Sequence, residues 1–92
     1  MNLTINVTPS GITLSNPLLG THCTLSYRGI LDLLHLLEGS EFDSDAIDGG
    51  YQVDITTSMV SAQRGHSYFV TDQRDYLTRS LQTLTLFNEQ EF

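Results

Sequence analysis

Hydrophobic and polar positions alternate strictly at the beginning of the chain. Residues 2–7 place their apolar side chains on one face and their polar side chains on the other, which is the pattern of a half-buried strand. The segment Thr8–Gly11 suits a type I turn, and residues 12–15 resume the alternation. Residues 2–15 are therefore predicted to form a hairpin. After the break at Asn16-Pro17, alternation over residues 23–27 predicts a third strand.

The periodicity changes between Arg28 and Gly39. On a helical wheel the centre of one apolar face is formed by Ile30, Leu33, Leu34 and Leu37. The opposite side is a narrow polar stripe made of Arg28, Asp32, His35 and Gly39, and it contains an i,i+4 Arg–Asp pair. Leu31 and Leu36 flank this stripe. The segment is predicted to be a helix with an apolar arc so wide that it needs covering on two sides.

Residues 40–50 are rich in turn-forming and acidic residues and are predicted to form a long linker. Alternation from Tyr51 to Met59 predicts a further strand, which pairs with residues 68–70 through a turn at residues 63–66. A final helix is expected from Asp72, which is placed to cap it, to Phe87. Its predicted apolar face consists of Tyr76, Leu77, Leu81, Leu84 and Phe87. The Thr-rich stretch from Leu81 to Phe87 is also compatible with a strand.

The predicted order is β-β-β-α-β-β-α, which is typical of a two-layer α+β domain. We expect an antiparallel sheet of about five strands with both helices on one face. A length of 92 residues and a hydrophobic fraction of 39% fit one small domain, spanning residues 1–92, with one core. The opposite sheet face is expected to be neutral and rich in hydroxyl groups.

The charge composition argues against two classes of partner. The formal net charge is -7, and all four basic residues are Arg, with no cluster that could neutralise a run of phosphates. Direct binding to nucleic acid and attachment to an anionic membrane are therefore not expected. The N-terminus has neither the charged region nor the apolar region of a signal peptide, and Cys23 is the single cysteine. These features favour a cytoplasmic location.

Three patterns in the sequence bear on catalysis and metal binding. Asp43, Asp45, Asp48 and Asp54 resemble a calcium loop, but the glycine comes one residue late and the twelfth position is not Glu. Cys23 adjoins His22, yet neighbouring residues of a strand point to opposite faces, so Cys23 is predicted to be a buried, inert thiol. The paired carboxylates lie in the predicted linker, where nothing would hold them in place. We therefore expect a protein that is not an enzyme and that has no cofactor.

The sharpest local feature is charge segregation. No Lys or Arg occurs from Gly29 to Gln63, whereas seven of the eleven acidic residues lie there. Such a stretch favours binding to a protein with a basic surface, and the alternative is an ordinary solvated loop. The predicted contact residues are the acidic stretch and the apolar helix flanks, namely Leu31, Asp32, His35, Leu36, Glu38, Glu41, Phe42, Asp43, Asp45 and Asp48.

Three other functions remain open at this point. The first is an inhibitor that presents carboxylates where a nucleic acid presents phosphates, as phage-encoded inhibitors of host defence do. The second is a calcium-binding or enzymatic module around Asp43 to Asp54. The third is a homodimer or larger self-assembly, in which the hydroxyl-rich sheet face or the wide apolar arc of the first helix pairs with its copy.

Overall fold

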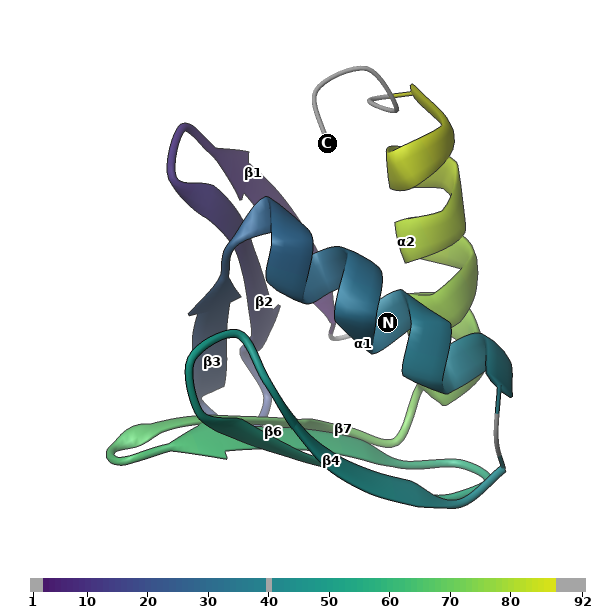
Figure 1. The fold of residues 1–92 in the computed structure, drawn as a ribbon. Helices are drawn as coiled ribbons and strands as arrows, with labels where there is room; N and C mark the ends of the chain where they lie inside the picture. The colour runs from purple at the N-terminus through teal and green to yellow at the C-terminus, as the bar shows by residue number, and fades with distance from the viewer. Residues whose placement is uncertain (1–2, 40, 88–92) are drawn as a thin grey trace.

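The computed structural model describes residues 3–39 and 41–87 (Figure 1). It contains one antiparallel sheet and two helices. The strands are β1 (Thr4–Thr8), β2 (Gly11–Asn16), β3 (Thr21–Leu25), β4 (Asp43–Ile47), β5 (Tyr51–Ile55), β6 (Val60–Arg64) and β7 (Ser67–Thr71). The helices are α1 (Tyr27–Gly39) and α2 (Arg74–Phe87). The predicted α+β class is confirmed.

The sheet has the order β1-β2-β3-β7-β6-β5-β4. Figure 1 shows β1 to β3 standing at a steep angle to β4 to β7, with both helices on the same side, inside that angle. The two parts meet where β3 pairs with β7, and the only paired Cα positions at this junction in the described residues are His22 and Tyr68. This narrow junction gives the bend, and the bend lets one sheet enclose α1 and α2 on two sides.

The prediction of about five strands was wrong, because the sheet has seven. One missed strand, β4, lies within the predicted linker, where it pairs with β5 from Asp43 opposite Ile55 to Ile47 opposite Tyr51. The other, β6, begins after a turn that interrupts the predicted strand 51–59. At this turn Thr56 N–H donates to Met59 O at 2.9 Å, and Met59 N–H donates to Thr56 Oγ1 at 3.1 Å.

The two helices follow the predicted pattern with one change at the start of α2. Ile30 and Leu33 are fully buried in α1, and Leu77 and Leu81 are fully buried in α2. The helix α2 begins at Arg74, two residues after Asp72, so the prediction that Asp72 is the N-cap was wrong. The stretch from Leu81 is helical rather than a strand, and the side chain of Phe87 lies outside the described residues.

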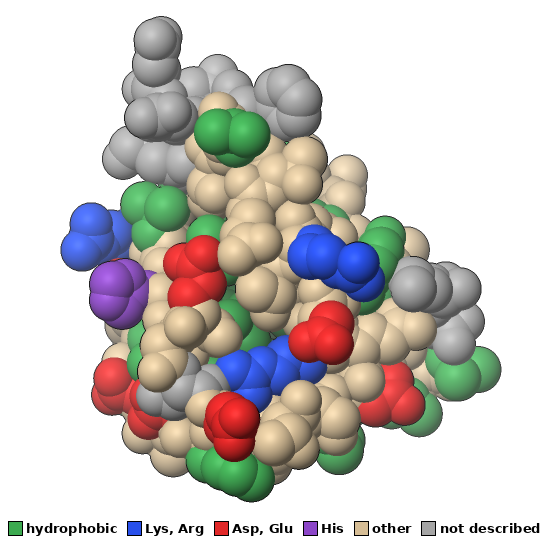
Figure 2. Space-filling view, turned by 90° about the vertical axis from the view of Figure 1, so that its right-hand side faces the viewer, with side chains coloured by type: hydrophobic (Ala, Val, Ile, Leu, Met, Phe, Trp, Pro, Cys, Tyr) green, Lys and Arg blue, Asp and Glu red, His purple; other side chains and the backbone are tan. Residues whose placement is uncertain are grey.

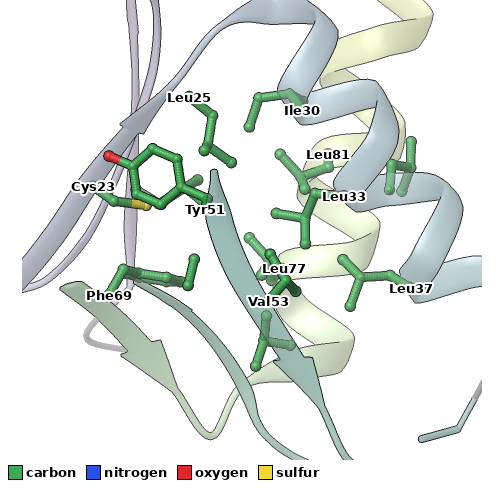
Figure 3. Close-up of a cluster of buried hydrophobic side chains, with 14 of the residues drawn as sticks. Cys23, Leu25, Ile30, Leu33, Leu37, Tyr51, Val53, Phe69, Leu77 and Leu81 are labelled. Atoms are coloured by element: carbon green, nitrogen blue, oxygen red, sulfur yellow. The ribbon is translucent and has the colours of Figure 1, made fainter. Parts of the chain in front are cut away.

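A single core fills the space between the helices and the sheet. Figure 3 shows side chains from β3, β5, β7, α1 and α2 pointing into the same interior. Phe69 is the largest side chain in it that is fully buried. Burial of this apolar surface from seven strands and two helices is the main stabilising contribution to the fold. Within the described residues, neither α1 nor α2 is long and apolar enough to cross a membrane.

Candidate interaction surface

The predicted contact residues lie on α1 and on the edge strand β4, which runs back along the helix. β4 begins shortly after the C-terminal end of α1, and its far end returns to the N-terminal end of α1. There the carboxylate of Asp48 accepts hydrogen bonds from the backbone N–H of Ser26, at 2.9 Å, and from the Ser26 hydroxyl. The return of β4 therefore places the turn at Asp48 beside the N-terminal end of α1.

Asp48 differs from the other predicted contact residues because its carboxylate is used inside the fold. It has a positive φ of 49° and begins the turn from β4 to β5, which Gly49 continues with a φ of 77°. Asp and Gly tolerate this left-handed conformation better than most residues. Arg64 also closes over the turn, since its Nη1 donates to Asp48 O at 3.3 Å and its guanidinium lies 4.4 Å from the centroid of the Tyr51 ring.

An exposed cluster, which we call the acidic corner, follows the C-terminal end of α1. It consists of Glu38, Glu41, Phe42, Asp43 and Asp45. Phe42 is 66% exposed, which makes it the most exposed aromatic residue in the part of the chain that the structure describes. Asp43 is half-buried, and the other three carboxylates are exposed. The acidic corner thus combines an exposed aromatic ring with four carboxylates.

Asp43 and Asp45 also protect the edge of the sheet. Asp43 lies opposite Ile55 and Asp45 lies opposite Val53. Both carboxylates are therefore on the same face of the sheet as these two buried side chains. Charged residues that point inward on an edge strand oppose pairing with a strand of another molecule. A contact with β4 through backbone hydrogen bonds is therefore disfavoured, and a partner would meet the side chains instead.

The helix residues of the predicted surface are exposed to different degrees. His35 is exposed, and Leu31 and Asp32 are half-buried. Asp32 forms the expected pair with Arg28 at 3.6 Å, and Leu36 packs partly against the core. The apolar flanks of the stripe are therefore less available to a partner than Phe42 is.

Arg74 is a buried structural contact that the sequence did not predict. Its side chain is buried, and its guanidinium donates to Leu37 O at 2.9 Å, to Glu41 O at 2.7 Å and to Thr56 O at 2.5 Å. A cation at the C-terminal end of α1 is favourable because the last carbonyls of a helix carry partial negative charge. Arg74 therefore holds the acidic corner against α2 and the β5–β6 turn. No local signal in the sequence distinguishes it from the exposed arginines.

The face of the molecule at the right of Figure 1 carries side chains of both charges. Figure 2 shows acidic and basic side chains interspersed with neutral and hydrophobic ones on the side of the molecule at the right of Figure 1. Seen from this side, the carboxylates do not form a continuous run like the phosphates of a nucleic acid. A partner bound to this face would contact individual carboxylates that lie beside apolar groups.

The predicted burial of Cys23 is confirmed. Its side chain is fully buried while His22 on the same strand is exposed, and burial raises the pKa of the thiol to about 12, with a smaller contribution from the negative charge of Asp48. A thiol in this environment is a poor nucleophile. In the part of the chain that the structure describes, no group of three or more His, Cys, Asp or Glu side chains is arranged to hold a metal ion.

Asp43, Asp45, Asp48 and Asp54 do not form a loop around one point. They are spread along the β4–β5 hairpin, and Asp54 faces the outer side of the sheet, where it accepts a hydrogen bond from the Ser44 hydroxyl at 2.8 Å. Comparisons with protein-family models, curated proteins and solved structures find no match for this chain.

Proposed function

We propose that this protein is a non-enzymatic interaction module that binds another protein with a basic surface through the acidic corner. The observation that carries the proposal is the exposed ring of Phe42, which stands directly between Glu41 and Asp43. Aromatic residues are enriched where interfaces contribute most of their binding energy. Carboxylates around such a ring select a partner with complementary charge.

The backbone of the acidic corner is held in place before binding. Arg74 bonds to the carbonyl of Glu41, and Asp43 and Asp45 belong to the paired strand β4. The exposed side chain of Glu38 accepts a hydrogen bond from Gln82 Nε2 of α2 at 2.8 Å. A surface that is ordered in the free protein loses less conformational entropy on binding than a mobile loop does.

The partner is best identified by cross-linking from the corner itself. A photoreactive phenylalanine analogue at position 42 is expected to capture the partner in an extract of the source cells. The same analogue at Tyr68, on the outer face of the sheet, is the control. The captured protein is then purified, and its association and dissociation rates are measured at about 50 and 500 mM salt.

If the carboxylates of the acidic corner attract a basic partner, removing them should change the association rate. Replacing Glu41 by Gln and both Asp43 and Asp45 by Asn should slow association about tenfold at low salt and flatten its salt dependence. Phe42→Ala should mainly accelerate dissociation. Asp54→Asn is the matched control for Asp45→Asn, because it removes a charge from the neighbouring strand on the opposite face. Unchanged rates in the triple variant and in Phe42→Ala would refute the proposal.

A further inference from the structure

A second feature of the surface is the edge strand β1. The sheet ends in β1 at one side and in β4 at the other, and within the described residues no strand pairs with the outer side of either. In an antiparallel pair, every second residue directs its backbone N–H and C=O away from the neighbouring strand. The outer side of β1 is therefore a row of backbone donors and acceptors that fits another extended strand.

The two edges of the sheet differ in how they are protected. β4 carries the carboxylates of Asp43 and Asp45 on the core side of the sheet, and such charges oppose pairing with another strand. β1 has the sequence Thr-Ile-Asn-Val-Thr, which includes neither a charged residue nor a proline. Val7 is 49% exposed, and Thr4 and Asn6 are also exposed. β1 is therefore the edge that can accept a further strand.

The residues of β1 form a near-palindrome around Asn6. If two copies pair antiparallel with Asn6 opposite Asn6, Ile5 lies opposite Val7. Thr4 then lies opposite Thr8. Branched apolar side chains meet on one face and hydroxyl groups on the other, and both kinds of cross-strand pair stabilise a sheet. The strand is therefore complementary to itself, as a contact with two-fold symmetry requires.

The charge distribution also favours a second copy as the occupant of this edge. No Asp, Glu, Lys or Arg occurs before Arg28, although the formal net charge of the chain is -7. The acidic corner follows α1 and continues into β4, at the other end of the strand order. Two copies that meet at β1 therefore bring together strands without charged side chains and avoid the cost of placing like charges side by side.

We propose that two copies of this protein form a symmetric dimer through antiparallel pairing of β1 with β1. The strand is ordered before association, because all five of its residues pair with β2 and the Tyr27 hydroxyl donates to Thr8 O at 2.7 Å. The dimer joins two sheets into one and leaves the two β4 edges at its ends. Because Asp43 and Asp45 protect those edges, assembly stops at two copies.

This contact uses the edge of the sheet and leaves the acidic corner free. The inference therefore goes beyond the proposed function and does not depend on it. A dimer that is found in a protein without a basic partner would leave the inference standing. A basic partner that binds a monomer would leave the proposed function standing.

Sedimentation equilibrium measures the association directly. A pair of five-residue strands is a small interface, so we expect a dissociation constant on the order of 10 to 100 µM at about 150 mM salt. Val7→Lys should weaken dimerisation at least about tenfold, because it places a charged side chain on the edge strand. Met59→Lys is the matched control, since Met59 is 45% exposed in the turn between β5 and β6 and receives the same charge.

Two outcomes of this experiment would overturn the inference. One is a protein that stays monomeric at about 1 mM, which would leave the edge to a strand of a different protein. The other is a Val7→Lys variant that dimerises as well as Met59→Lys does. Circular dichroism of both variants checks that each has kept the fold.

Disulfide cross-linking tests the register in protein that carries Cys23→Ala. Asn6→Cys places each new thiol opposite its copy, and Cα atoms that lie directly opposite are about 4.5 to 5.5 Å apart, within the range of a disulfide. Thr4→Cys is the matched control, because it lies on the same face but opposite Thr8 of the second copy. Under mild oxidation, Asn6→Cys should form a linked dimer at least about tenfold faster than Thr4→Cys. Equal rates would refute the register and with it the inference.

Discussion

Ser26 and Asp48 lie 22 residues apart and are joined by two hydrogen bonds from the backbone and the hydroxyl of Ser26 to one carboxylate. The Ser26 hydroxyl also accepts a hydrogen bond from Gly29 N–H at 3.1 Å, as a residue that caps a helix does. Asp48 therefore orders the cap of α1 and fastens the β4–β5 turn to it. This contact fixes how the edge strand runs along the helix, and with it the position of the acidic corner.

Asp48→Ala is expected to lower the free energy of unfolding by about 2 kcal/mol or more. The change removes two hydrogen bonds to a charged group and places alanine at a positive φ. Asp45→Ala removes the same charge from an exposed position of β4 and should change stability by no more than about 0.5 kcal/mol. Urea unfolding of both variants measures the difference, and equal midpoints would show that the Ser26 contact contributes nothing.

Gly29→Ala should destabilise the protein, although alanine is ordinarily the better helix residue. A Cβ at position 29 would lie 2.6 Å from Asp48 Cγ, so the substitution must push the Asp48 side chain away from Ser26. We expect a loss of about 1 to 3 kcal/mol. Gly39→Ala, at the other end of α1, has open space around the new Cβ and should be neutral or slightly stabilising. Thermal melts of the pair compare the two ends, and a gain in stability at position 29 would contradict the close packing.

Arg74→Met should cost about 3 kcal/mol or more, because it leaves the carbonyls of Leu37, Glu41 and Thr56 without the donor that they share. Arg79→Met, at an exposed site on the same helix, is the control and should change stability little. Hydrogen exchange would locate the effect, with faster exchange expected in the last turn of α1 and in β4. A variant as stable as the control would mean that Arg74 does not hold these segments together.

Cys23→Ala should cost about 1 kcal/mol, since it removes a small buried side chain from the core. Because burial raises the pKa of the thiol from 9.0 to about 12, the folded state favours the protonated form. That contribution to stability is fully present below pH 9.0 and decreases as the pH rises towards 12. Unfolding measured across this range should show a smaller decline in Cys23→Ala than in the parent protein. Rapid labelling of the native thiol at pH 8 would contradict its burial.

Periodicity in the sequence was sufficient to predict the first hairpin, α1 and the core face of α2. It failed for β4 because that strand buries only Ile47, and its other residues are poor strand formers. The sequence did contain a usable signal, since Asp48-Gly49 is a pair that favours hairpin turns. The division between β5 and β6 was missed because Thr57 and Met59 continue the alternation of β5 through a turn.

The candidate site was only partly accessible from the sequence. Charge segregation pointed to Glu38, Glu41, Asp43 and Asp45, which the structure places in the last turn of α1, in the segment after it and in β4. It did not separate Asp48, whose carboxylate is used by Ser26, from the exposed acids. Phe42 was among the predicted contact residues, and only its 66% exposure in the structure distinguishes it from the half-buried Leu31 and Leu36.

The sequence by itself determined properties of short segments: the type of most elements, the apolar face of each helix, and the excess of acidic residues between Gly29 and Gln63. The tertiary structure decided which distant groups meet. Arg74 contacts Glu41 across 33 positions and Asn16 contacts Val70 across 54, and neither pair has a signature in the residues around it. Hydrophobic periodicity records how one segment faces the core, whereas hydrogen bonds between distant segments form only where the bent sheet brings the two partners together.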